Sequence, residues 1–185
     1  MTTELLDEFL VLSVDLTAFE ETDLLGTGLA RQYLAKVRDA CGAEVVTALL
    51  AAHRAARTDA AGNGDQAVLD RTVLDRTVLD RTVLDRALRH RIFSDDRLGP
   101  VARNVIKLWY AGMWFGLPPE WIDCYGAHPA AGTSTVTAAS YQEGLLWRAI
   151  GANPPGAKAP GYGAWAEPPR IEDRYLKGHR NDRNR

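Results

Sequence analysis

Apolar residues recur at helical spacing along the first third of the chain. Three segments place large apolar side chains every three or four positions, with polar residues between them: 5–12, 22–41 and 43–56. This period is typical of amphipathic helices. Thr22 is a possible N-cap of the second segment, and Gly42 is a stop signal at its end. We therefore predict three helices here, followed by a polar, glycine-containing loop over residues 57–64.

The helical period returns after residue 98. Pro100 suits the first turn of a helix, and Val101, Val105 and Leu108 lie along its apolar side. Residues 117–136 have no clear period, whereas residues 137–150 fit a last helix. We therefore predict an all-α fold, an irregular helical bundle that occupies residues 1–150 and carries an insertion at about 57–90.

The chain changes character at residue 151. The segment NPPGAKAPGYGAWAEPP is too rich in proline and glycine for a helix or a regular sheet. It also contains Tyr162 and Trp165, large apolar side chains that solvated linkers seldom carry. We predict a long extended arm over residues 151–169 that lies across a surface, and a charged tail over residues 170–185.

A five-residue repeat, VLDRT, fills residues 68–86, and its fourth copy lacks only the Thr. Four copies would make a single coil of a β-solenoid, and stacked repeats need neighbours to bury their faces. In a helix, five residues advance about 500°, or 140° after full turns, so the four leucines point in different directions. Arg81 and Asp85 can pair at i,i+4. We predict an expanded coding repeat, tolerated as a longer surface helix, rather than a functional module.

Charge and composition exclude several classes of function. The net charge is −2, so the molecule has no general attraction to nucleic acid or to an anionic membrane. Seven acidic residues precede the first basic one, Arg31, unlike the basic start of an export signal. No apolar run approaches the ~20 residues of a membrane span. Cys41 and Cys124 are too few for a disulfide framework. We expect a cytoplasmic protein.

Motifs of self-sufficient enzymes are missing from the sequence. It has no P-loop, no G-x-S-x-G and no H-E-x-x-H. Gly26 and Gly28 form a G-x-G, but Arg31 occupies the position at which a dinucleotide-binding fingerprint needs Gly or Ala. The four histidines are far apart, which disfavours a metal site. Cys124 and His128 are the nearest approach to a nucleophile and its base, and a helical enzyme using this loop stays an alternative.

Aromatic residues are concentrated in the second half. All five tryptophans lie between residues 109 and 165. Trp109 and Tyr110 diverge by about 100° on a helix, so one can face the core and the other outward. Gly112 and Gly116 leave shallow spots on the same predicted helix, where another backbone can approach. Because Trp and Tyr anchor protein interfaces, this arrangement suits a subunit that clasps a larger one.

These segments resemble a known family. LWYAGMW (108–114), SYQEGLLW (140–147) and NPPGAKAPGYGAWAEPP (153–169) are similar to the small subunit of membrane-associated FAD-containing sorbitol and fructose dehydrogenases. FLVLSVDLTAF (9–19), LLGTGLARQYL (24–34) and VVTALLAAH (45–53) agree. The resemblance covers roughly residues 5–55 and 98–169, and it skips the VLDRT repeat.

The resemblance implies a non-catalytic partner of a large flavoprotein of the glucose-methanol-choline type. The large subunit would bind FAD and oxidise a sugar or polyol, and this chain would carry no cofactor, metal or catalytic residue. Positions implied for the partner interface and the fold are Trp109, Tyr110, Gly112, Trp114, Tyr141, Trp147, Pro155, Gly156, Gly163, Trp165 and Pro168.

Two further expectations follow from the resemblance. The isolated protein should be poorly soluble or partly unfolded, because its aromatic face awaits a partner. Family members carry a twin-arginine export signal that is not seen here, so we expect a cytoplasmic complex, or a periplasmic one if the signal was removed or lies upstream. A chaperone that leaves its client after folding is a further alternative, and stoichiometry distinguishes it from a permanent subunit.

Overall fold

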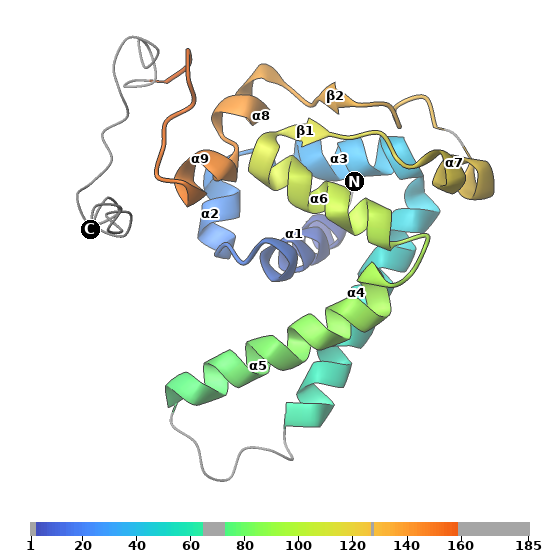
Figure 1. The fold of residues 1–185 in the computed structure, drawn as a ribbon, viewed down its shortest axis with the longest axis vertical. Helices are drawn as coiled ribbons and strands as arrows, with labels where there is room; N and C mark the ends of the chain where they lie inside the picture. Colours follow the sequence, from blue (N-terminus) through green and yellow to red (C-terminus); the bar gives the residue numbers. More distant parts are fainter. Residues whose placement is uncertain (1–2, 65–72, 127, 159–185) are drawn as a thin grey trace, which may run out of the picture. The chain divides into compact units, whose positions relative to one another are not determined.

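The computed structural model describes residues 3–64, 73–126 and 128–158. They divide into two compact units, Met1–Leu146 and Trp147–Arg185. The described residues are mostly α-helical with one short two-stranded ribbon (Figure 1). This confirms the predicted all-α class. The greater part of the predicted arm, residues 159–169, and the tail at 170–185 lie outside the described residues.

Residues 3–64 form four helices: α1 (Thr3–Thr17), α2 (Glu21–Gly26), α3 (Ala30–Cys41) and α4 (Ala43–Gly64). The prediction of one helix over 22–41 was wrong, because the chain breaks between α2 and α3. The Thr27 hydroxyl donates to Leu24 O at 2.7 Å and accepts from Leu29 N at 3.2 Å. Gly28 follows at φ +70°. A side chain that bonds the local backbone in this way competes with helical pairing.

Gly42 ends α3 as predicted, at φ +86° with its N–H bonded to Arg38 O at 2.8 Å. The predicted loop over 57–64 was wrong, because α4 continues to Gly64. The extra turns of α4 lie beside α5 (Val73–Leu88), and the two helices form a hairpin (Figure 1). A packed neighbour stabilises residues whose own helix propensity is low.

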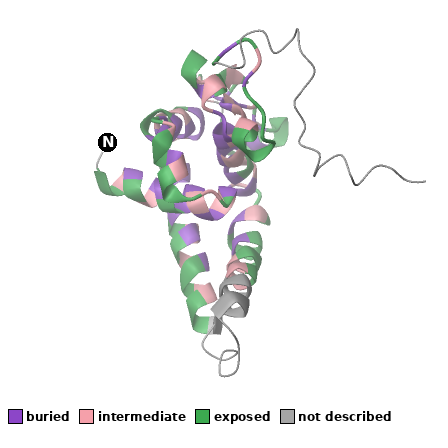
Figure 2. Cartoon of the chain, turned by 90° about the vertical axis from the view of Figure 1, so that its left-hand side faces the viewer, coloured by how far each residue is buried: buried purple, intermediate pink, exposed green. Residues whose placement is uncertain are grey.

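The C-terminal copies of the VLDRT repeat pack against the rest of the fold. α5 carries the VLDRT copies from Val73 onward and leads into a π-helical turn, η1 (Arg89–Phe93). The predicted i,i+4 pair forms, with Arg81 Nε and Asp85 Oδ1 3.3 Å apart. Leu84 packs against the core. In residues 43–62 of α4 the last buried position is Ala56, and Figure 2 shows the outer side of this helix largely exposed.

α6 (Gly99–Ala111) forms much of the core, with Pro100 in its first turn as predicted. Its inward residues are completely buried: Val101, Ala102, Val105, Leu108 and Trp109 are all 0% exposed. The helix contacts both α1 and α3. The core therefore lies where α6 meets the first half of the chain.

After α6 the chain runs through short elements. β1 (Met113–Trp114) pairs antiparallel with β2 (Ser134–Thr135), and α7 (Pro119–Tyr125) lies between them in sequence. The prediction of one helix over 137–150 was wrong, because α8 (Ala138–Gln142) and α9 (Leu145–Ala149) are separate. They part at Gly144, where a Cβ would lie 2.7 Å from Tyr110 O. The close approach of α6 decides the break.

Candidate functional site

Two tryptophans of the predicted interface lie inside the chain's own core. Trp109 and Trp114 are both 0% exposed. The Trp109 ring stacks near Phe9, with centroids 6.5 Å apart, and meets Tyr33 edge-on at 4.8 Å. Trp114 Nε1 donates to Ala131 O at 3.1 Å. In this fold both side chains support the core and are shielded from an outside partner.

Another backbone does approach Gly112, and it belongs to the same chain. Gly112 caps α6 at φ +69°, and a Cβ there would lie 2.2 Å from Ser140 O. The Ser140 hydroxyl lies 2.7 Å from Gly112 O, to which it donates. Gly116 is not on the same helix, contrary to expectation, because it follows β1 and donates its N–H to Thr133 Oγ1 at 2.8 Å.

The remaining predicted residues differ in exposure. Tyr110 is half-buried and donates its hydroxyl to Thr17 O at 3.1 Å, and Tyr141 is 39% exposed. In the second unit Trp147 and Pro155 are half-buried and Gly156 is exposed. A further set lies outside the described residues: Gly163, Trp165 and Pro168. Tyr141 is thus the first-unit member of the predicted set with the most accessible ring.

The residues of the enzyme alternative lie in different surroundings. Cys124 is an exposed, free cysteine of α7. His128 is half-buried, and its ring lies 3.1 Å from where a Gly42 Cβ would stand. The His128 ring therefore packs on the turn between α3 and α4.

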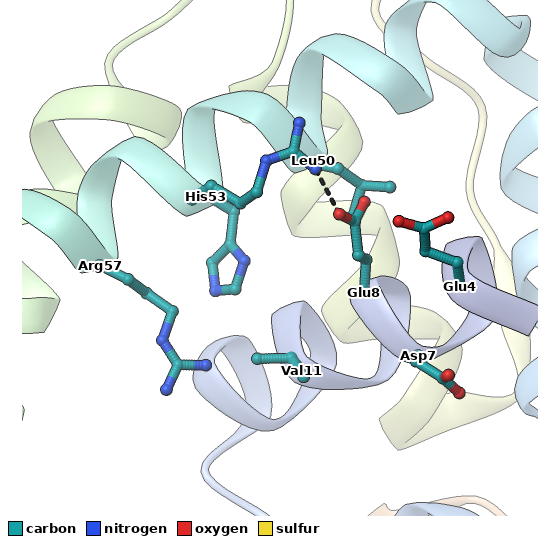
Figure 3. Close-up of a pocket in the computed structure, with 8 residues that line it drawn as sticks. Glu4, Asp7, Glu8, Val11, Leu50, His53 and Arg57 are labelled. Atoms are coloured by element: carbon teal, nitrogen blue, oxygen red, sulfur yellow. Dashed lines mark hydrogen bonds and ion pairs between the residues drawn. The ribbon is translucent and has the colours of Figure 1, made fainter.

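A pocket of about 460 Å³ lies between α1 and α4 (Figure 3). We name it the α1–α4 groove, and its lining residues are Glu4, Asp7, Glu8, Val11, Leu50, His53, Arg54 and Arg57. Figure 3 shows Glu4 and Asp7 towards one end and Arg57 at the other, with the Arg54–Glu8 ion pair between them. The floor is apolar and the charged residues form the rim.

A buried histidine–carboxylate pair, with two more exposed arginines around it, stands beside this groove. His53 Nε2 lies 2.7 Å from Asp15 Oδ2, and the two side chains are 4% and 9% exposed. An Arg57 nitrogen lies 3.6 Å from the same carboxylate oxygen. Arg81, from the repeat helix, donates to Asp15 O at 2.9 Å. Because a buried charge without its partner is costly, this cluster holds α1, α4 and α5 together.

The sequence pattern indicated part of this site. His53 continues the helical spacing of the apolar residues Val45, Val46, Leu49 and Leu50 in the sequence, and all five are buried in the structure. A histidine on an apolar face calls for a polar partner. Asp15 could not be named as that partner, because the crossing of α1 and α4 is set by tertiary packing.

Within residues 3–64, 73–126 and 128–158, no three residues of the His, Cys, Asp and Glu types cluster in a way that could hold a metal ion. Of the helices described, none has both the length and the apolar character needed to cross a membrane.

Comparison with known proteins adds no relative. No protein-family model, curated protein or solved structure matches the chain. The functional argument therefore rests on the motifs of the sequence and on the geometry just described.

Proposed function

We propose that this protein is a non-catalytic small subunit of a flavoprotein dehydrogenase. It binds, stabilises and helps to mature a large FAD-dependent subunit of the glucose-methanol-choline type that oxidises a sugar or polyol. FAD and the catalytic residues belong to the large subunit. The proposal originates in the ordered motifs at 108–114, 140–147 and 153–169.

One structural observation supports it above the others. The first two motifs pack against each other, although the 25 residues 115–139 separate them in sequence. Gly112 admits the Ser140 backbone, and Gly144 admits the Tyr110 carbonyl. A side chain at either glycine would collide with backbone, which explains why both motifs carry glycine at these positions. The pair behaves as one structural element that presents Tyr141.

Aromatic exposure supports a binding role for this element. Tyr141 is 39% exposed and Leu146 is 37% exposed. Tyrosine combines apolar bulk with one polar tip and is common at the energetic centre of interfaces. We propose that Tyr141 contacts the large subunit, with the 151–169 segment extending the interface.

Co-expression with the flavoprotein encoded by the adjacent gene tests the function. We expect a 1:1, flavin-coloured complex on size exclusion. Elution of the two proteins as separate peaks under gentle conditions would refute a permanent subunit. Recovery of an active flavoprotein that no longer carries this chain would instead identify a transient chaperone.

A matched pair of variants tests the role of Tyr141. Tyr141→Ala should weaken the complex about tenfold or more, as truncation of an interface anchor does. Tyr125→Ala is the control, because Tyr125 is 40% exposed but lies on α7. Equal affinities of the two variants would remove Tyr141 from the interface.

A further inference from the structure

We infer that the α1–α4 groove is a second docking site, which receives an amphipathic helix of the large subunit. The inference deepens the proposed function and rests on it. The proposed ligand is a helix that carries apolar side chains at its centre, a positively charged side chain towards one end and a negatively charged side chain towards the other.

The floor of the groove supplies the apolar contact. Leu50 is 2% exposed and forms the base, whereas Val11 is 36% exposed. Valine is a large enough apolar group to gain from coverage, at about 25 cal/mol per Å² of buried apolar surface. The volume of about 460 Å³ falls within the range of pockets that enclose a ligand group. This volume is several times that of one Leu or Phe side chain, so apolar side chains from successive turns of a partner helix would fill it.

The charged residues of the rim would set the orientation of a docked helix. Glu4 and Asp7 on α1 are exposed acids that form no ion pair within the part of the chain that the structure describes. Arg57 stands at the other end with its side chain 51% exposed. Figure 3 shows these opposite charges on either side of the apolar floor. A docked helix would therefore place its cation over Glu4 and Asp7 and its anion over Arg57.

The length of this pattern indicates a polypeptide. Glu4 and Asp15, whose carboxylate contacts Arg57, are eleven positions apart on α1, about 16 Å along the helix axis. That span equals about three turns of a docked helix. Helix-in-groove recognition uses such a spacing of anchors.

The concave floor argues against a second copy of this chain as the occupant. The rim charges of two copies could pair in an antiparallel arrangement, because each groove has an acidic end and a basic end. Two hollows that face each other do not fill each other, however, and an isologous dimer would bury an empty space. A convex helix from another chain fits the same charges and also fills the floor.

The test compares groove variants with matched controls in the full-length protein. The affinity of each for the FAD-loaded large subunit is measured, after thermal unfolding has shown that the variant folds. Val11→Lys is paired with Leu25→Lys, since Leu25 is an apolar residue of α2 that is 51% exposed. The second groove variant combines Glu4→Lys and Asp7→Lys. Its control combines Glu120→Lys and Asp123→Lys, which replace two exposed acids at the same spacing on α7.

We expect the dissociation constant to rise tenfold or more for both groove variants and to change less than twofold for both controls. If the unaltered chain binds and the groove variants bind like their controls, the groove is not the docking site, while the proposed function stands. If the unaltered chain does not bind, the proposed function and the inference both fall. If the isolated chain is a dimer that Val11→Lys dissociates, a second copy occupies the groove and the inference is wrong.

Discussion

At the scale of single residues, the fold depends on a few contacts that admit no substitution. Gly112 is the clearest, because it combines a positive φ with a backbone neighbour from α8. The Asp15–His53 pair is another, since its two side chains are buried together between α1 and α4. Both tie together segments that are far apart in the sequence.

Gly112→Ala should destabilise the protein strongly, and Gly28→Ala should not. Both glycines have φ near +70°, so both variants incur the left-handed strain of about 1–2 kcal/mol. A Cβ at Gly112 would in addition lie 2.2 Å from Ser140 O, whereas nothing lies within 4 Å at Gly28. We expect Gly112→Ala to cost at least about 2 kcal/mol more than Gly28→Ala. Urea unfolding of both measures the difference, and equal costs would contradict the packing described for α8.

Cys41 predicts how stability varies at alkaline pH. Burial raises the pKa of its thiol from 9.0 to about 12, and nearby Lys36 opposes this rise only in part. A raised pKa means that the folded state keeps its proton where the unfolded state loses it. The stability contribution is therefore complete below pH 9 and is lost as the pH rises towards 12.

At pH 10.5 the expected loss from Cys41 is about 2 kcal/mol relative to pH 8. Urea unfolding at the two pH values, with Cys41→Ala beside the unaltered chain, measures it. The variant should show the smaller decrease, because other groups titrate equally in both proteins. An identical decrease would show that the thiol is accessible to water.

At the scale of elements, the sequence predicted where helices form better than where they break. The apolar period located α1, α3, α4 and α6, and Gly42 and Pro100 marked real boundaries. The breaks after α2 and after α8 were missed. The first depends on a local hydroxyl–backbone bond at Thr27, and the second on the close approach of α6 to Gly144. The extension of α4 was missed because it is stabilised by α5 rather than by its own residues.

The α1–α4 groove could not be predicted from the sequence either, because it depends on tertiary packing. Its acids lie on α1 and its arginines on α4, and nothing in either segment fixes how the two helices cross. The sequence placed one of Trp109 and Tyr110 towards the core, and Trp109 is the buried one, while Tyr110 is half-buried. Phe9 of α1 and Tyr33 of α3 pack against the Trp109 ring, and these neighbours could not be named from the sequence.

The repeat is expected to tolerate shortening. Deleting residues 73–82 removes two copies and no net charge, and it brings Arg71 and Thr72 directly before Val83. Because the copies are identical, Arg71 then takes the place of Arg81 beside Asp15. We expect the unfolding free energy to change by less than about 2 kcal/mol and partner binding to be retained. Ile92→Ala, at a completely buried position of η1, should cost more, about 3 kcal/mol.

Thermal and urea unfolding of the two variants test this order. A deletion as harmful as Ile92→Ala, or one that abolishes the complex, would assign the repeat a role of its own. The structure gives a reason for the expected tolerance. Among the described residues of α5, Arg81 contacts Asp15, and Leu84, Ala87 and Leu88 contact the core. The shortened chain keeps the last three and places Arg71 where Arg81 stood.

At the scale of the whole molecule, the first unit encloses its own aromatic core. That the isolated chain is poorly soluble or partly unfolded stays a prediction, and Trp109 and Trp114 are buried within the chain itself. The exposed apolar side chains of this unit are dispersed, and they include Val11, Leu25 and Tyr141. The binding surface that we propose is therefore built from separate anchors on a folded scaffold.

The most direct test of this account is sedimentation velocity of the co-expressed pair, followed through the flavin absorbance and the protein absorbance together. We predict one species that contains both chains in a 1:1 ratio and that persists on dilution to the submicromolar range. Flavin that sediments at the mass of the large subunit alone, with this chain in a separate boundary, would contradict the assignment of a bound small subunit.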